Sequence, residues 1–244
     1  MLLLSTSSLH RYGLNRIFHF AKRLGFQGIE LVVNDIADTR DADYIRDLQQ
    51  QYDLPVFSIV TPQKSTIEKT KSVIDLADAL NTGTVVIRSP LWSEFGYASW
   101  LRSNIPRFAK IYSRQICFEN PPRGESLVLP KYAFGNINEI AGFKNLALDT
   151  THLFSRQLDL MRVYERHKSV IRYIRLSDTR RGSEHLLPGD GILPLESFLA
   201  HLAKDKYTGG IAIKVDYQQA GADDPKEVEK NLGRVKKFFD EFYR

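Results

Sequence analysis

The chain has 244 residues, of which 43% are hydrophobic and 26% charged, and its formal net charge is +5. This length and composition allow one large globular domain, and no apolar run approaches the roughly 20 residues that a membrane-spanning helix needs. The positive charges are interspersed with acids, which disfavours a nucleic-acid track, so we expect no membrane or nucleic-acid partner and take the cytoplasm as the default location. The single cysteine, Cys117, excludes an intramolecular disulfide and lies in an apolar run, so we expect a buried thiol.

Short apolar runs recur about every thirty residues, a period typical of repeated strand–helix units. Amphipathic helical patterns lie between several of them, for example over residues 14–24, 67–80 and 228–242. The eight runs lie near Leu2, Ile29, Val56, Val85, Ile116, Leu146, Ile171 and Ile211. We therefore predict an α/β fold, a single (β/α)8 TIM barrel over residues 1–244. A doubly wound sheet is the competitor, but the turn after the first run, residues 5–10, lacks the glycine-rich phosphate motif of such sheets.

Two residues are suited to cap helix starts, Asp41 and Ser65. Three segments are expected to be long loops, Ser89–Ser99, Pro121–Leu129 and Asp178–Gly191, because they contain much of the glycine and proline. All three follow strands, so in a barrel they surround the mouth at which active sites form.

Polar residues collect at the ends of the predicted strands. The expected mouth is lined by residues 5–8 and by His10, Glu30, Asn34, Thr61, Arg88, Glu119, Asn120, Asp149, His152, Arg175, Asp178, Lys214 and Asp216. A barrel end that serves stability alone does not need such a mixture of acids, bases and amides. This end is therefore the predicted site of chemistry.

Four motifs, in the same order and at suitable spacing, resemble the xylose isomerase-like (sugar phosphate isomerase/epimerase) TIM barrels. Gly25-Phe-Gln-Gly28-Ile-Glu30-Leu31 is similar to the family's second strand and Phe118-Glu119-Asn120 to its fifth. Leu148-Asp149-Thr150-Thr151-His152 is similar to the sixth strand, and Glu184-His185-Leu-Leu-Pro188-Gly189-Asp190-Gly191 to the loop after the seventh. The resemblance covers nearly the whole chain and implies isomerase or epimerase activity on a carbohydrate.

The resemblance also implies a metal site, which in the family consists of a Glu, an Asp, a His and a Glu from strands five to eight. Glu119 and Asp149 match the first two ligands, which suit Mg²⁺, Mn²⁺, Co²⁺ or Zn²⁺. The third and fourth positions depart from the family: Arg175 stands where the family has His, and Lys214 where it has Glu.

The two substitutions change what the site can bind. Arginine has no lone pair to offer a metal, and a lysine beside two carboxylates is held charged. We therefore expect Arg175 and Lys214 to face Glu119 and Asp149 and to replace the metal electrostatically, with no cofactor. The alternatives are a rearranged metal site with Glu119, Asp149 and either His185 or His152, and a misalignment of the last two strands.

Other residues have proposed roles at the mouth. Glu30 is either a proton-transfer base, as its motif implies, or a strand-end acid paired with an arginine. With Glu119, Asp149 and Lys214 it makes up the predicted catalytic set. The predicted substrate-binding residues are His152, Arg175, His185, Asp178 and Arg88.

Three functions are compatible with this sequence. The first is an isomerase or epimerase for a small, carbohydrate-like ligand, and an anionic one would suit the cations at the mouth. The second is a non-catalytic barrel that binds such a ligand. The third is a DNA-repair nuclease of the endonuclease IV type, which is disfavoured because the mouth has few histidines and no basic stripe. The sequence assigns neither a substrate nor an oligomeric state.

Overall fold

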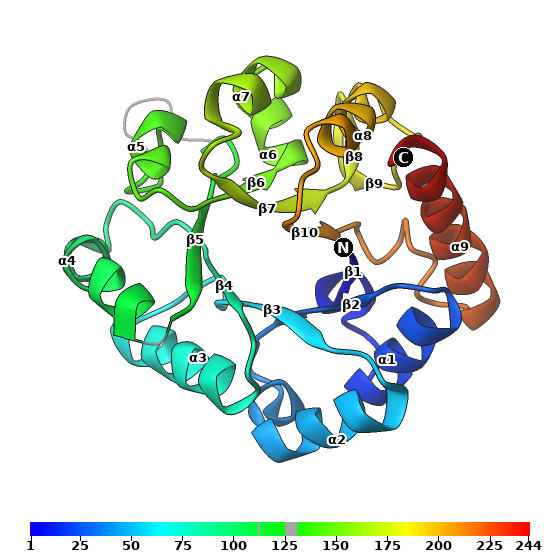
Figure 1. Cartoon of the computed structure of the whole chain (residues 1–244), viewed down its shortest axis with the longest axis horizontal. Helices are drawn as coiled ribbons and strands as arrows, with labels where there is room; N and C mark the ends of the chain where they lie inside the picture. The colour runs from blue at the N-terminus through cyan, green and yellow to red at the C-terminus, as the bar shows by residue number, and fades with distance from the viewer. Residues whose placement is uncertain (112, 125–130) are drawn as a thin grey trace.

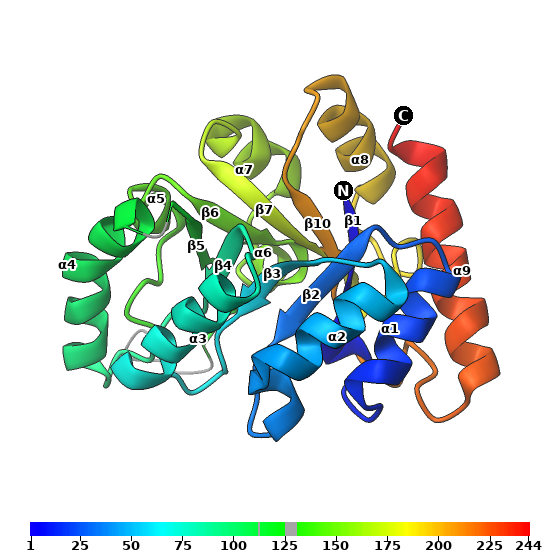
Figure 2. The ribbon, with the colours of Figure 1, turned by 60° about the horizontal axis from the view of Figure 1, so that its bottom comes forward.

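The computed structural model describes residues 1–111, 113–124 and 131–244, and these form a closed (β/α)8 barrel. Figure 1 looks along the barrel, with the strands at the centre and helices around them, and Figure 2 shows it from the side. The barrel strands are β1 (Leu2–Ser5), β2 (Gly28–Val32), β3 (Val56–Val60), β4 (Thr84–Ile87), β5 (Gln115–Glu119), β6 (Leu146–Asp149), β7 (Ile171–Leu176) and β10 (Gly210–Ile213). All neighbours are parallel, and β1 closes the ring by pairing with β10. The predicted fold class and all eight strand positions are confirmed.

Helices follow the strands and cover the outside of the barrel. They are α1 (Leu14–Arg23), α2 (Ala42–Tyr52), α3 (Ile67–Ala79), α4 (Phe95–Ile111), α5 (Ile137–Ala141), α6 (Thr150–Ser155), α7 (Leu160–His167), α8 (Leu195–Lys204) and α9 (Pro225–Phe242), with two short 3₁₀ helices at Thr6–Leu9 and Ala37–Arg40. Among the described residues, none of these helices has the length and apolar character needed to cross a membrane. The main hydrophobic core lies between the helices and the outer face of the strands.

Of the two predicted helix caps, one is confirmed and one is corrected. The side chain of Asp41 accepts from the backbone N–H groups of Asp43 and Tyr44 and caps α2, as expected. For α3 the cap is Thr66, one residue after the expected Ser65, which instead hydrogen-bonds the Thr70 hydroxyl. Either hydroxyl could satisfy the first turn, so the sequence alone does not distinguish them.

Two of the three expected loops contain regular structure. The segment Ser89–Ser99 ends early, because α4 begins at Phe95. Asp178–Gly191 contains an antiparallel hairpin of β8 (Asp178–Arg180) and β9 (Ser183–Leu186). The third loop, Pro121–Leu129, lies outside the described residues from position 125 onward.

Inside the barrel, one residue from each strand forms a second buried cluster. Its members are Leu3, Val32, Val60, Val86, Cys117, Ala147, Tyr173 and Ala212. Cys117 is fully buried, as expected, and burial raises the pKa of its thiol to about 12. Because side chains on a strand alternate between faces, the residue two positions further along each strand points the same way. The apolar cluster therefore forms one layer of the barrel interior, and the residues two positions later form a polar layer at the mouth.

Candidate active site

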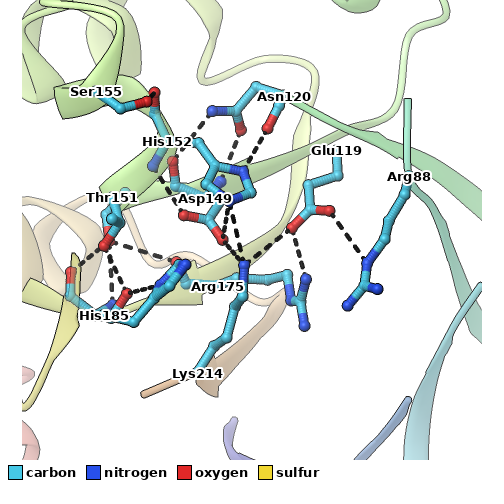
Figure 3. A network of polar contacts seen from close by, with 12 residues as sticks. Arg88, Glu119, Asn120, Asp149, Thr151, His152, Ser155, Arg175, His185 and Lys214 are labelled. Carbon is cyan, nitrogen blue, oxygen red and sulfur yellow. Dashed lines mark hydrogen bonds and ion pairs between the residues drawn. The ribbon is translucent and has the colours of Figure 1, made fainter. Parts of the chain in front are cut away.

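The polar layer is built from the strand positions that follow the apolar cluster. Arg88, Glu119, Asp149, Arg175 and Lys214 each stand two residues after a member of that cluster, on β4, β5, β6, β7 and β10 or just beyond them. Figure 3 shows these five side chains converging on one another. The period of two thus explains why charged residues far apart in sequence meet at one end of the barrel.

Arg175 lies at the centre of this layer and is fully buried. Its Nε donates to both carboxylate oxygens of Glu30, at 3.2 and 3.0 Å, and its Nη2 donates to Oε1 of Glu30 at 2.8 Å. Its Nη1 donates to Oε1 of Glu119 at 2.6 Å. Burial alone would lower the pKa of the guanidinium, but Glu30 and Glu119 outweigh it and raise that pKa.

The structure places these two cations beside the two carboxylates and adds one partner. Arg175 pairs with Glu119, Lys214 pairs with Asp149, and Arg175 also pairs with Glu30. Of the two sequence-based alternatives for Glu30, the geometry favours the acid paired with an arginine. Both of its oxygens accept from Arg175, and the residue is fully buried.

The ammonium of Lys214 lies among three groups that can accept a hydrogen bond from it. Its Nζ is 2.7 Å from Oδ2 of Asp149, 3.3 Å from Nε2 of His152 and 3.7 Å from Oε1 of Glu119. The side chain is 13% exposed, so it can be reached from the mouth. An ammonium has three N–H donors. Two of them are directed at Asp149 and His152, and the third makes no hydrogen bond with the described residues.

The hydrogen bonds of His152 fix its tautomer. Its Nδ1 lies 2.8 Å from the backbone oxygen of Asn120, which can only accept, so Nδ1 carries the proton. The lone pair of Nε2 then faces the Lys214 ammonium. Burial lowers the pKa of His152 and Lys214 lowers it further, against the opposing effect of Asp149. His152 is therefore a neutral acceptor at neutral pH.

The spacing of three residues between Asp149 and His152 follows from a helix cap. The Oδ1 of Asp149 accepts from the backbone N–H of His152 at 3.0 Å and so caps α6, which begins directly after β6. Asn120 brackets the strand end: it accepts from the Asp149 N–H at 2.7 Å and donates to the Asp149 carbonyl at 3.1 Å. Burial raises the pKa of Asp149, but His152 and Lys214 outweigh it and hold that pKa well below its usual range.

Glu119 is shared by three cations. Its Oε1 contacts Arg175 and faces Lys214, while its Oε2 lies 3.8 Å from Nε of Arg88. Burial raises the pKa of Glu119, but Arg175 and Lys214 more than compensate and hold it at about 2. The carboxylate is therefore ionised at neutral pH. Its Oε2 accepts no hydrogen bond from the described residues.

The donor set resembles a metal site, but the arrangement does not accommodate one. Ligand atoms of Glu119, Asp149 and His152 lie within 4.8 Å of one another, and carboxylate and imidazole donors suit Zn²⁺ or Mn²⁺. The Nζ of Lys214, however, faces all three. A dication in this space would be repelled by the ammonium and by Arg175. With Lys214 in place, these residues do not fit a divalent metal.

The hairpin after β7 contributes two of the predicted residues in different ways. Asp178 accepts four backbone N–H groups, from Thr179, Gly189, Gly191 and Leu193, at 2.8 to 3.1 Å. A Cβ on Gly191 would lie 2.3 Å from Oδ1 of Asp178, which explains the glycine of that motif. Both oxygens of Asp178 are thus used by the loop, and we propose a positioning role for it rather than substrate contact.

His185 lies beside the lysine–carboxylate group. Its Nδ1 is 3.0 Å from the Ser177 hydroxyl, and its ring centre is 5.6 Å from that of His152. Burial and the nearby Lys214 lower its pKa to about 3. It does not belong to the group of three possible metal donors.

Two residues at the site were not among the predicted site residues. Asn120 was expected at the mouth but not as the group that holds Asp149 and His152, and its position directly after Glu119 is the signal that points to it. The side chain of Glu184 forms no hydrogen bond or ion pair with the described residues. Burial and the nearby Asp149 raise its pKa. Glu184 begins the motif of the loop after the seventh strand, directly before His185, and this position is the signal that points to it.

Comparisons with known proteins agree with this fold. The family model for the xylose isomerase-like TIM barrels matches residues 18–238. An uncharacterized protein of Mycobacterium tuberculosis is 23% identical, over 92% of this chain and 91% of its own length.

Three solved structures share the fold across nearly all of the chain. A D-tagatose 3-epimerase-like protein is 19% identical with a TM-score of 0.72, and the match covers 98% of both chains. An L-ribulose 3-epimerase is 16% identical with a TM-score of 0.72, covering 99% of this chain and 94% of the other. The IolI protein with a bound zinc atom is 11% identical with a TM-score of 0.71, covering 99% and 95%. At these identities the likeness shows the fold alone.

Proposed function

Because the chain belongs to the xylose isomerase-like TIM-barrel family, we propose that it is a sugar isomerase- or epimerase-like enzyme in which the Lys214 ammonium takes the place of a divalent metal. The observation that carries the proposal is the position of Nζ of Lys214 among Asp149, His152 and Glu119. The solved epimerases of the same fold support a small polyhydroxylated substrate.

The role of Lys214 follows from its unused donor. A carbonyl or hydroxyl oxygen of the substrate that accepts this N–H becomes polarised, which acidifies the carbon-bound hydrogen beside a carbonyl. Asp149 and His152 hold the ammonium in position, since Oδ2 of Asp149 and Nε2 of His152 each accept one of its N–H groups. The charge that a bound metal supplies in such a site is here supplied by a side chain.

Removal of the proton from the substrate carbon requires a carboxylate with an oxygen that is free to accept it. Glu119 has one, Oε2, on the side of Arg88. Glu30 has none, because Arg175 occupies both of its oxygens, so we propose an electrostatic role for Glu30 instead of proton transfer. Glu184, with its raised pKa, is the second candidate for moving the proton.

One observation favours a second function, a barrel that binds a carbohydrate-like ligand without turnover. The low pKa of Glu119, about 2, makes it a weak base in the free protein. Incubation with D-tagatose, D-ribulose or D-fructose in deuterated water separates the two functions. An isomerase or epimerase exchanges the hydrogen next to the carbonyl, and a binding protein does not.

The first test addresses the ammonium directly. Protein purified without chelators should contain well below one equivalent of divalent metal by mass spectrometry. Lys214→Ala should bind Zn²⁺ at least tenfold more tightly than the wild type in a calorimetric titration, because the three donors are then free. A tightly bound equivalent of metal in the wild type contradicts the proposal.

The variant Lys214→Met provides the catalytic arm of the same test. It is close to lysine in size but has no charge, so hydrogen exchange and turnover of any accepted ketose should fall by about a thousandfold. Turnover retained by Lys214→Met would remove the lysine from the mechanism.

A further inference from the structure

We infer that Arg88 binds an anionic group of the ligand, a carboxylate or a phosphate. In the substrate, only a few bonds separate this group from the oxygen that Lys214 polarises. Arg88 directly follows β4, and its backbone N–H donates to the Thr61 hydroxyl at 3.1 Å, which fixes the strand end. Its side chain is 20% exposed. It is thus anchored at the mouth and still open to a ligand.

The side-chain donors of Arg88 make no hydrogen bond with the part of the chain that the structure describes. Its only ion pair among the described residues is with Glu119, through Nε at 3.8 Å, which is beyond hydrogen-bond distance. Arg175, in contrast, makes four hydrogen bonds to two carboxylates. In Figure 3 the two terminal nitrogens of Arg88 point away from Glu119. A guanidinium fork in this state matches the two oxygens of a carboxylate or phosphate.

The electrostatic surroundings point to an anion as well. Burial lowers the pKa of Arg88 and Arg175 lowers it further, although Glu119 and Glu30 act in the opposite direction. The charged form is therefore less favoured than in water. A ligand anion at the terminal nitrogens would restore the stabilisation that burial removes.

The position of Arg88 relative to Lys214 limits the substrate, and this step rests on the proposed function. The two cations flank a single carboxylate: Lys214 lies 3.7 Å from Oε1 of Glu119, and Arg88 lies 3.8 Å from Oε2. If one substrate oxygen contacts Lys214, an anionic group that reaches Arg88 must therefore be attached close to the reacting carbon. The substrate class is a short sugar acid or sugar phosphate, or a longer one with its anionic group at the reacting end.

Three small probes of matched carbon skeleton test the anion site: glycerol, D-glycerate and glycerol 3-phosphate. Binding to the wild type is measured by protein NMR titration. At least one of the two anions should bind saturably and at least tenfold more tightly than glycerol, and the preferred one identifies the group as carboxylate or phosphate. If neither anion binds more tightly than glycerol, the inference is overturned.

The variant Arg88→Met should lose this preference for anions. The matched control is Arg172→Met, which removes the same charge at the start of β7, at the end of the barrel opposite the mouth, and should keep the preference. Preference retained by Arg88→Met, or lost equally in both variants, overturns the role of Arg88. The binding assay is independent of turnover: anion binding through Arg88 without hydrogen exchange contradicts only the proposed function. Turnover of neutral ketoses with no effect of Arg88→Met contradicts only this inference.

Discussion

At the scale of single residues, Arg175 sets the charge balance of the mouth. That an arginine and a lysine stand at the mouth follows from the sequence, because each falls on a recognisable strand end. The sequence leads us to expect Glu119 as a partner of Arg175, but it does not single out Glu30. Glu30 comes within reach through the barrel interior, and the pairing of β2 with β3 shifts register at Ile29 and Glu30. Neither the shift nor the reach of the arginine side chain leaves a mark in the hydrophobic pattern.

Arg175→Met should be one of the most destabilising single substitutions at the mouth. It leaves two buried carboxylates, Glu30 and Glu119, without their main counter-ion, and we expect unfolding in urea to lose about 3–5 kcal/mol. Arg102→Met is the control, because its ion pair with Glu139 is exposed and should contribute less than about 1 kcal/mol. A loss for Arg175→Met no larger than the control would show that the buried pairs contribute little.

At the scale of elements, the strands and main helices are predictable because their hydrophobic periods run over several residues. The β8–β9 hairpin is not, since strands of three and four residues are too short to display alternation. Asp178 is the residue that organises this segment. It was predicted to contact substrate because it ends a strand, and the sequence does not show that four loop amides already surround it.

Asp178→Ala should loosen the segment that follows β7. Four backbone N–H groups lose their acceptor, and we expect a loss of about 3 kcal/mol in unfolding free energy. Amide hydrogen exchange of Gly189, Gly191 and Leu193 should accelerate in parallel. Asp190→Ala, in the same loop, removes only a partly exposed ion pair with Arg234 and should leave these amides protected. Unchanged exchange in Asp178→Ala would contradict the assigned role.

At the scale of the whole molecule, the site makes folding sensitive to acid. His185 has a pKa of about 3 in the folded chain against an ordinary value of 6.5, so below pH 6.5 the unfolded chain binds the proton more readily. Glu119, whose pKa falls from 4.5 to about 2, adds a loss of stability as the pH falls through that lower window. Both groups therefore favour unfolding as the pH decreases.

The contribution of His185 can be isolated between pH 7 and pH 5. The shift predicts that it accounts for about 2 kcal/mol of the stability lost over this interval. His185→Gln should reduce the difference between urea unfolding free energies at the two pH values by that amount. Ser177→Ala breaks the same hydrogen bond but keeps the imidazole, so it should lower stability at both pH values and preserve the difference. An equal pH dependence in His185→Gln and the wild type would refute the assignment.

The bond between Arg175 and Glu30 also has a consequence for the order of assembly. The two residues are 145 positions apart, one on the second strand of the barrel and the other on the seventh. During synthesis the first half of the chain emerges with Glu30 long before its cation exists. A half-barrel that collapsed early would have to bury this carboxylate without Arg175, at a cost of several kcal/mol. The polar layer thus disfavours closure of an incomplete barrel. It stabilises the closed barrel only once β7 has joined the ring and brought Arg175 to Glu30.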